Sequence, residues 1–269
     1  MRSWLFTPGN DRRKVSKALT AAADVVIVDW EDGVPEEQRS VAHELALELL
    51  SQRAADGPRL VIRTQSAATP GFAADLEVIG LEIDPERVLP PRDGVRFELG
   101  GFELADHRPH LVRAFNVLRQ YDVDQVERAW ESVLSRLVPG GLFIEGTCDE
   151  IGRRAVWLLL DRDGPVSLTF AWDPWDVEKP SDLAERLPKI LIHRNVPGER
   201  IHALLSAADQ AWDHAAGWEP YGPRVRWRNA RQMLIDEGWP ITPVRRNLRD
   251  SLLTVPWAAV APEGGATGD

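Results

Sequence analysis

Short apolar runs separated by amphipathic stretches follow one another along most of the chain. A run rich in β-branched or aromatic residues predicts a buried strand, whereas apolar residues at three- and four-residue spacing predict a helix. This alternation of strands and helices is typical of an α/β fold. The expected strands cover residues 3–6, 24–30, 59–63, 78–83, 95–99, 111–117, 142–146, 166–172 and 252–255, and residues 155–160 form a further strand or a helix end.

The helix pattern is clearest in the middle of the chain. Val126, Trp130 and Val133 recur at helical spacing, and Asp122 precedes them as a candidate N-cap. The turn Pro139-Gly140-Gly141 ends the helix. Because a strand is expected on each side, this stretch predicts a parallel pair joined by a right-handed crossover. Further helices are expected at residues 11–23, 35–52, 199–216 and 222–236.

The composition of the chain limits the kinds of partner, location and metal site that can be expected. The chain has 269 residues, of which 43% are hydrophobic and 28% charged, an ordinary globular mixture. A net charge of −10 gives no global support for a nucleic-acid or anionic-membrane partner, and no apolar run is long enough to span a bilayer. No signal-peptide pattern opens the chain, so a cytoplasmic location is expected. The single cysteine, Cys148, excludes an intramolecular disulfide and a cysteine-rich zinc site.

The first segment resembles a known family. The matching stretches are Arg2–Gly9, Asp24–Pro35, Val61–Arg63 and Thr69–Leu76. In order and content they look like the citrate lyase beta-subunit-like aldolases, the HpcH/HpaI group. That resemblance implies strands of a TIM-type barrel, a small acyl-CoA or oxoacid substrate and Mg²⁺, with Arg63 contacting the substrate carboxylate. The two magnesium-binding carboxylates of that family find no counterpart later in the sequence.

The remainder, residues 77–260, resembles a different family. The matching stretches are Val78–Pro85, Val95–Phe102, Leu137–Leu142, Glu145–Glu150 and Lys179–Glu199. Together they look like class I S-adenosylmethionine-dependent methyltransferases. This resemblance implies a Rossmann-like, mostly parallel open sheet, to which the N-terminal segment adds βα units of aldolase-barrel type. The domains expected are therefore 1–76, an incomplete barrel, and 77–261, the methyltransferase-like part, followed by a disordered tail at 262–269.

The methyltransferase resemblance implies a set of cofactor-binding residues. Glu82 and Asp84 follow the second strand of that fold, where an acid binds the ribose, and Gly101 and Phe102 would border the adenine. Asn116 would line the cleft. Each has a structural alternative: Asp84 with the following proline can cap a helix, the glycine can serve an ordinary turn, and the Asn116 amide can bond to backbone.

Substrate-binding candidates lie at other strand ends. Glu145 and Asp149 follow the fifth strand of the methyltransferase-like part, where carboxylates could select or deprotonate an amine or hydroxyl. Arg63 is the corresponding candidate of the aldolase-like part, in which Glu31, Asp32 and Arg63 are expected at strand ends on the same side of a sheet. Cys148 is more often a buried small side chain than a nucleophile at such a position. No catalytic residue and no metal ligand is assigned.

One missing motif shapes the functional hypothesis. Class I methyltransferases hold the methionine half of the cofactor at a glycine-rich turn after the first strand, and no G-x-G follows a strand here. The leading hypothesis is a small-molecule methyltransferase of unknown acceptor that uses S-adenosylmethionine, or a derivative with impaired cofactor binding. The alternatives are a non-catalytic fusion product joined between residues 69 and 80, and an acyl-CoA or oxoacid lyase using Mg²⁺.

Overall fold

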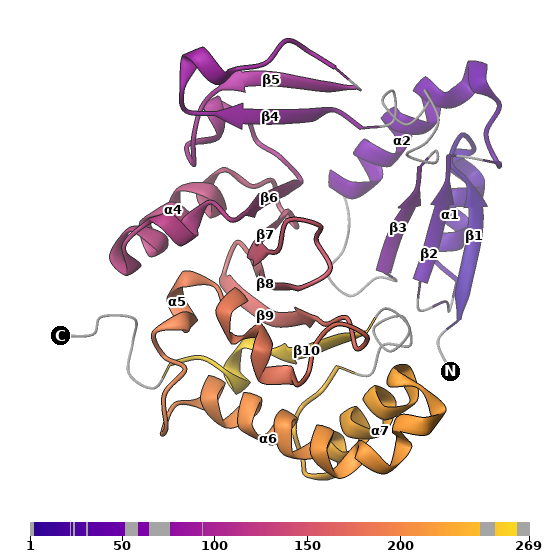
Figure 1. Cartoon of the computed structure of the whole chain (residues 1–269). Coiled ribbons are helices and arrows are strands. Elements are labelled where there is room, and N and C mark those ends of the chain that lie inside the picture. Colours follow the sequence, from indigo (N-terminus) through magenta and orange to yellow (C-terminus); the bar gives the residue numbers. More distant parts are fainter. Residues whose placement is uncertain are drawn as a thin grey trace. The chain divides into compact units, whose positions relative to one another are not determined.

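The computed structural model describes residues 3–21, 23, 25–30, 32–51, 59–64, 76–92, 94–242 and 251–262. The chain divides into two compact units, residues 1–101 and 102–269, each with its own sheet structure (Figure 1). Both units combine helices with β-sheet, so the expected α/β class is confirmed. Most of the proposed join and of the expected disordered tail lies outside the described residues. The boundary between residues 76 and 77 concerns family resemblance and stays a prediction.

The first unit begins with a three-stranded parallel sheet in the order β1-β2-β3. Its strands are β1 (Trp4–Pro8), β2 (Val25–Asp29) and β3 (Arg59–Arg63). Helix α1 (Arg12–Leu19) links β1 to β2, and helix α2 (Arg39–Ser51) follows β2. The expected βα units are therefore present.

Strand β2 is the centre of the core of this unit. All five of its residues are buried, as its uninterrupted apolar run predicts for a central parallel strand. Val15 of α1 and Ala42 of α2 are fully buried in the cluster that surrounds the strand. Helix α1 begins after Asp11, whose side chain accepts a hydrogen bond of 3.0 Å from the Lys14 N–H and so caps the helix.

A separate two-stranded sheet completes the unit. Strand β4 (Val78–Glu82) pairs in parallel with β5 (Val95–Leu99). Gly80 allows the two strands to pack, because a Cβ at this position would lie 2.7 Å from Cδ1 of the Phe97 ring. The pairing direction agrees with the prediction, but among the described residues these strands join neither of the other two sheets.

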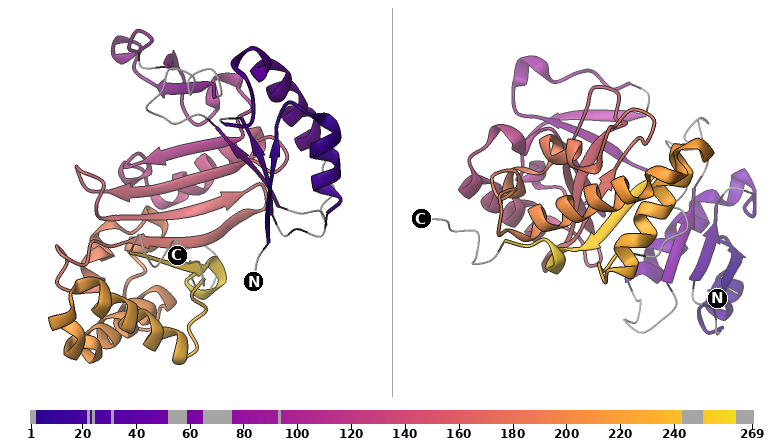
Figure 2. Two further views of the ribbon diagram at one scale, coloured as in Figure 1. Left: turned by 90° about the vertical axis from the view of Figure 1, so that its right-hand side faces the viewer. Right: turned by 60° about the horizontal axis from the view of Figure 1, so that its bottom comes forward.

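The second unit contains a five-stranded sheet in the order β10-β9-β8-β7-β6, seen from two directions in Figure 2. Strands β6 and β7 are parallel and flank helix α4, which confirms the predicted strand–helix–strand unit. The remaining pairings are antiparallel. The elements are β6 (Leu111–Phe115), α4 (Val123–Arg136), β7 (Leu142–Cys148), β8 (Ala155–Asp161), β9 (Gly164–Ala171) and β10 (Leu252–Pro256).

The sheet structure differs from the single, mostly parallel, Rossmann-like sheet that the sequence led us to expect. The described residues form three sheets, and the largest is mixed. The physical reason lies in the connections. Only Arg162 and Asp163 separate β8 from β9, and the β7–β8 link is also short. A parallel pair needs a crossover of about a dozen residues, so both links enforce antiparallel pairing.

One face of the five-stranded sheet is covered by helices. Phe143, Leu158 and Leu168 on this face are fully buried, whereas Trp157 and Leu159 on the other face are half-buried. The ring of Trp172 contacts those of Trp212 and Trp227 edge-on, at centroid distances of 4.7 and 4.3 Å. Core packing is therefore the role of these tryptophans. The helices of this part are α5 (Lys189–Ile192), α6 (Arg200–His214) and α7 (Pro223–Asp236).

Short 3₁₀ segments connect the main elements. They are η1 (Glu36–Gln38), η2 (Pro85–Arg87), η3 (Leu104–Asp106), η4 (Leu118–Gln120), η5 (Pro180–Arg186), η6 (Ala215–Tyr221) and η7 (Trp257–Ala259). Within the described part of the chain, no helix has the length and apolar character needed to cross a membrane.

The turn after β1 leads to a stability prediction. A Cβ at Gly9 would lie 2.6 Å from Cδ1 of Trp30, which is itself only 5% exposed and has little room to move. Gly9→Ala should lower the free energy of unfolding by about 1–3 kcal/mol, as overpacking does in other cores. Urea unfolding measures this, with Gly217→Ala as control because a Cβ there meets nothing within 4 Å. Equal free energies of unfolding for the two variants would contradict the close packing of Gly9 against Trp30.

Candidate functional site

The carboxyl edge of the N-terminal sheet brings together an arginine and two carboxylates. Asp29 and Arg63 are the last residues of β2 and β3, and the parallel register sets them opposite each other. The backbone N–H of Trp30 donates to the Arg63 carbonyl at 2.9 Å, which continues the pairing past the strand end. Because ligands of parallel sheets bind at this edge, the cluster is the leading candidate for a functional site in the first unit.

Arg63 connects the two acids. One terminal nitrogen, Nη1, lies 3.3 Å from Oδ2 of Asp29, and the other, Nη2, lies 2.7 Å from Oδ2 of Asp32. The Asp29 side chain is 11% exposed, whereas that of Asp32 is 76% exposed. The Arg63 side chain is 37% exposed. The guanidinium thus pairs with one nearly buried and one exposed carboxylate, and its side chain is partly exposed.

Two glycines shape this edge. The Gly9 N–H donates to the Asp29 carbonyl at 3.0 Å, which brings the turn after β1 against the end of β2. A Cβ at Gly33 would lie 3.3 Å from Oδ2 of Asp29, so the glycine lets the following loop approach the carboxylate. The sequence predicted Glu31, Asp32 and Arg63 on this side but did not single out Asp29, and Glu31 lies outside the described residues. The signal was present, because Asp29 ends the most apolar strand of the chain.

The predicted ribose ligands, Glu82 and Asp84, sit at the end of β4 in local contacts. Glu82 accepts a hydrogen bond of 3.1 Å from the Asp84 N–H and pairs with Arg87 at 3.6 Å. Asp84 accepts from the Glu86 N–H at 3.0 Å and caps η2, with Pro85 in its first turn. The structural alternative for Asp84 is therefore present, while ribose binding stays a prediction.

Asn116 lies at the carboxyl end of β6 and is linked to the end of β7. Its backbone is in the left-handed region, with φ +62°, a conformation that asparagine tolerates better than most residues. Its side-chain Oδ1 accepts from the Cys148 N–H at 2.9 Å, and its Nδ2 lies 3.5 Å from the Cys148 sulfur. The alternative role for this amide, a bond to backbone, is thus observed. The residue is still exposed.

Gly101 and Phe102, the predicted adenine neighbours, fall at the boundary between the two units. The Phe102 ring meets that of Tyr121 edge-on at 5.7 Å, and its carbonyl accepts from the Ser132 hydroxyl at 3.0 Å. These contacts fix Phe102 against α4. Of the five predicted cofactor ligands, Glu82, Asp84 and Gly101 belong to the first unit, whereas Phe102 and Asn116 belong to the second. That these residues surround one ligand stays a prediction.

The predicted substrate ligands Glu145 and Asp149 occupy unlike positions. Asp149 holds the β7–β8 turn, because its Oδ1 accepts from the Arg153 N–H at 2.8 Å. Glu145 is only 1% exposed on β7, and its Oε2 has no hydrogen-bond partner among the described residues. Burial raises the pKa of Glu145 to about 8. That burial argues against direct substrate contact, and the assignment stays a prediction.

The described residues do not gather a metal centre. No group of three or more histidine, cysteine, aspartate or glutamate side chains comes together in the part of the chain that the structure describes. At the edge of the N-terminal sheet, the described carboxylates of Asp29 and Asp32 both pair with the Arg63 cation. Carboxylate oxygens suit Mg²⁺, but each of these two is already paired with the guanidinium, so the described residues offer no preformed site for the ion.

The N-terminal part of the chain is similar to known proteins. Residues 2–92 match the family described as HpcH/HpaI aldolase/citrate lyase. A citrate lyase subunit beta-like protein of Mycobacterium tuberculosis is 41% identical over 76 residues, which cover 28% of this chain and 26% of that protein. A protein of the same description from Deinococcus radiodurans is 35% identical over 89 residues, 31% of each chain. The alignments thus span about a quarter to a third of these relatives.

These matches support only one of the two family resemblances found in the sequence. They support the citrate lyase-like assignment of the N-terminal segment, and they give no support to the methyltransferase resemblance of the rest. The family match also runs past residue 76 and includes β4, so Glu82 and Asp84 lie within it. The citrate lyase-like alternative is consequently better supported than the leading hypothesis.

The buried carboxyl of Glu145 leads to a pH prediction. Its pKa is near 8 in the fold and near 4.5 in the unfolded chain, so the protonated form stabilises the fold. Stability should be highest below about pH 4.5 as far as this group is concerned, and fall by a few kcal/mol as pH rises to 8. Unfolding midpoints of the wild type and Glu145→Gln, compared across this range, test the effect. Glu145→Gln should not lose stability over this pH range. If the stability of the wild type and of the variant changed with pH in the same way, the raised pKa of Glu145 would be contradicted.

Proposed function

We propose that the N-terminal part of this chain binds a small carboxylic acid of the oxoacid or acyl-CoA class through Arg63. The observation that carries the proposal is the placement of this guanidinium at the carboxyl edge of three parallel strands, between Asp29 and Asp32. Arginine binds carboxylates through two parallel N–H donors, which gives both affinity and orientation. The match of residues 2–92 to the aldolase/citrate lyase family supports the same ligand class.

The two acids have different roles in this proposal. Asp29 is nearly buried and holds Nη1, so it fixes the plane of the guanidinium and is a positioning residue. Asp32 is exposed and follows the strand on a turn, so its pair with Nη2 contributes little to stability. An incoming carboxylate can therefore replace Asp32 at Nη2 at small cost. The Asp29–Arg63 pair stays in place during this exchange.

The proposal covers recognition of the acid and not its cleavage. In the aldolase/citrate lyase family a bound divalent metal supplies electrophilic stabilisation of the enolate that carbon–carbon cleavage generates. The described residues do not gather ligands for such an ion. Asp29 and Asp32 serve Arg63 instead, and we derive no chemical step for this chain.

Calorimetric titration of the full chain with oxaloacetate tests the proposal. Binding should be saturable, and Arg63→Gln should weaken it by about tenfold or more, because a charge-assisted pair contributes about 1.5–3 kcal/mol. Arg12→Gln is the matched control. Arg12 is also a surface arginine of this unit, paired with Glu48 of α2 rather than with a strand-end acid.

Two outcomes would overturn this assignment. The first is the absence of heat at millimolar oxaloacetate, and the second is equal affinity of the wild type and Arg63→Gln. Incubation with malyl-CoA and Mg²⁺ separates recognition from cleavage. We expect no release of acetyl-CoA, and turnover that is lost in Arg63→Gln would replace the binding proposal with a lyase.

A second candidate function for residues 77–260 is binding of S-adenosylmethionine, as in a class I methyltransferase of unknown acceptor. The observation that favours it is the parallel β6–α4–β7 unit, in which Asn116 and Cys148 meet at the carboxyl edge. The parallel β4–β5 pair, with Glu82 as the last residue of β4, is a second feature of this kind.

The residues present fit only part of this cofactor. Glu82 accepts one backbone N–H and is partly exposed, so its carboxylate can accept the hydroxyls of a ribose. The methionine half lacks its usual partner, because the sequence contains no G-x-G after a strand. When bound, the cofactor would supply an activated methyl group. Glu82 would hold the ribose, and affinity would be low.

Titration with S-adenosylhomocysteine tests this second candidate. We expect weak, saturable binding, weakened about tenfold by Glu82→Gln because a neutral amide accepts hydroxyl hydrogen bonds less strongly than a carboxylate. Glu77→Gln is the control, since Glu77 is an exposed acid just before the same strand. No heat at millimolar ligand, or the same loss of affinity in both variants, would exclude the nucleoside site.

A further inference from the structure

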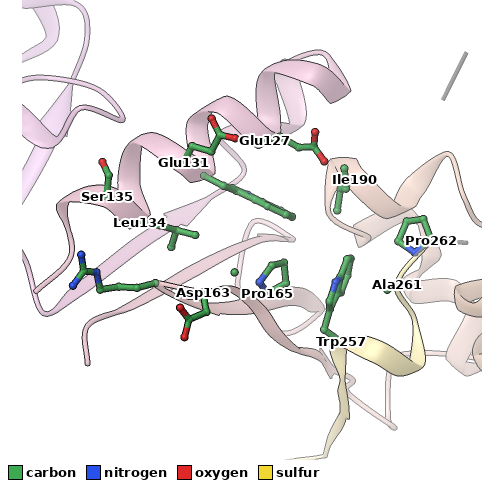
Figure 3. Close-up of a pocket in the computed structure, with 13 residues that line it drawn as sticks. Glu127, Glu131, Leu134, Ser135, Asp163, Pro165, Ile190, Trp257, Ala261 and Pro262 are labelled. Atoms are coloured by element: carbon green, nitrogen blue, oxygen red, sulfur yellow. The ribbon is translucent and has the colours of Figure 1, made fainter. Parts of the chain in front are cut away.

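The second unit contains a pocket that neither proposed function uses. It has a volume of about 700 Å³, which lies within the range of small-molecule sites. Figure 3 shows α4 along one wall, with Glu127 and Glu131, and Pro165 and Trp257 across from it. All of the lining residues belong to residues 102–269, so the pocket is formed within one compact unit.

The wall of the pocket is apolar and aromatic. Trp257 is half-buried at the start of η7, and Pro165 at the start of β9 lies beside it (Figure 3). Trp130 of α4 contributes to the opposite wall and is 7% exposed. Its indole nitrogen is buried without a hydrogen-bond partner among the described residues. Because this nitrogen is buried, Trp130 presents ring carbons to the pocket and adds to its apolar wall.

The rim of the pocket is acidic. Glu127 and Glu131 lie one helical turn apart on α4, and Asp163 comes from the β8–β9 turn. Among the described lining residues, these three carboxylates face a single guanidinium, that of Arg162. Neither glutamate has an ion-pair partner in the described part of the chain. Two like charges one turn apart destabilise a helix slightly, so a bound cation would relieve that cost.

We propose that this pocket binds an organic cation, a small molecule with an ammonium group next to an apolar or aromatic body. The carboxylates of Glu127 and Glu131 attract the charge, and the electron-rich face of Trp257 interacts favourably with an alkylated ammonium. The apolar body packs against Pro165 and Ile190. An anionic ligand is disfavoured by the excess of carboxylates. The site is independent of the carboxylate site at Arg63, which lies in the other unit.

Benzyltrimethylammonium is a suitable probe, followed by quenching of tryptophan fluorescence and by calorimetry on the full chain. We expect saturable binding that weakens about tenfold in the double variant Glu127→Gln/Glu131→Gln, because both attractive charges are removed. Trp257→Leu should also weaken binding by about fivefold through loss of the cation–π contact. Glu237→Gln is the matched control, an exposed acid at the end of α7.

An anionic probe of similar shape, phenylacetate, distinguishes charge recognition from simple apolar binding. We expect no saturable binding of phenylacetate. The proposal fails if benzyltrimethylammonium does not saturate, if phenylacetate binds as tightly, or if the double variant binds like the wild type. Circular dichroism of each variant shows whether the fold is intact, and the glutamines keep the helical propensity of α4.

Discussion

Parallel pairing of β2 with β3 is the constraint on which the candidate carboxylate site depends. The register sets Asp29 opposite Arg63, and parallel strands place all of their carboxyl ends at one edge. A shift of one residue in β3 would turn Arg63 to the other face and separate it from the buried acid. The apolar run of β2 maintains that register, because each of its residues is buried between the packed elements.

The second unit follows a different organising rule. Its five-stranded sheet buries one face fully and leaves the other half-buried, and its helices pack on the buried face. Glu145 lies on the buried face without a hydrogen-bond partner for Oε2 among the described residues. The acidic pocket lies elsewhere, at the rim where the β8–β9 turn and η7 meet α4. Burial thus distinguishes a carboxyl that affects stability from carboxylates that are available to a ligand.

The sequence predicted the elements better than their pairing. An uninterrupted apolar run such as Val25–Asp29 predicts a strand buried on both faces, typical of a central parallel strand, whereas the runs of the second unit do not fix the pairing direction. The two-residue link Arg162-Asp163 is typical of an antiparallel hairpin, whereas the methyltransferase resemblance implied a mostly parallel sheet. Arg63 and Asp32 were predicted because both lie at strand ends on the same side of a sheet. The pocket at Trp257 was not predicted, because its walls come from segments more than a hundred residues apart.

The number of strands is the physical basis for our proposal of recognition without cleavage. An eight-stranded barrel has no sheet edges, and its catalytic groups come from the ends of several strands. The N-terminal sheet described here has three strands, of which β1 and β3 are edges. Among the described residues, its carboxyl edge supplies an arginine with two acids, and no group of metal-ligating side chains gathers there. A binding contact needs only such a local group, whereas enolate chemistry needs groups from later strands as well.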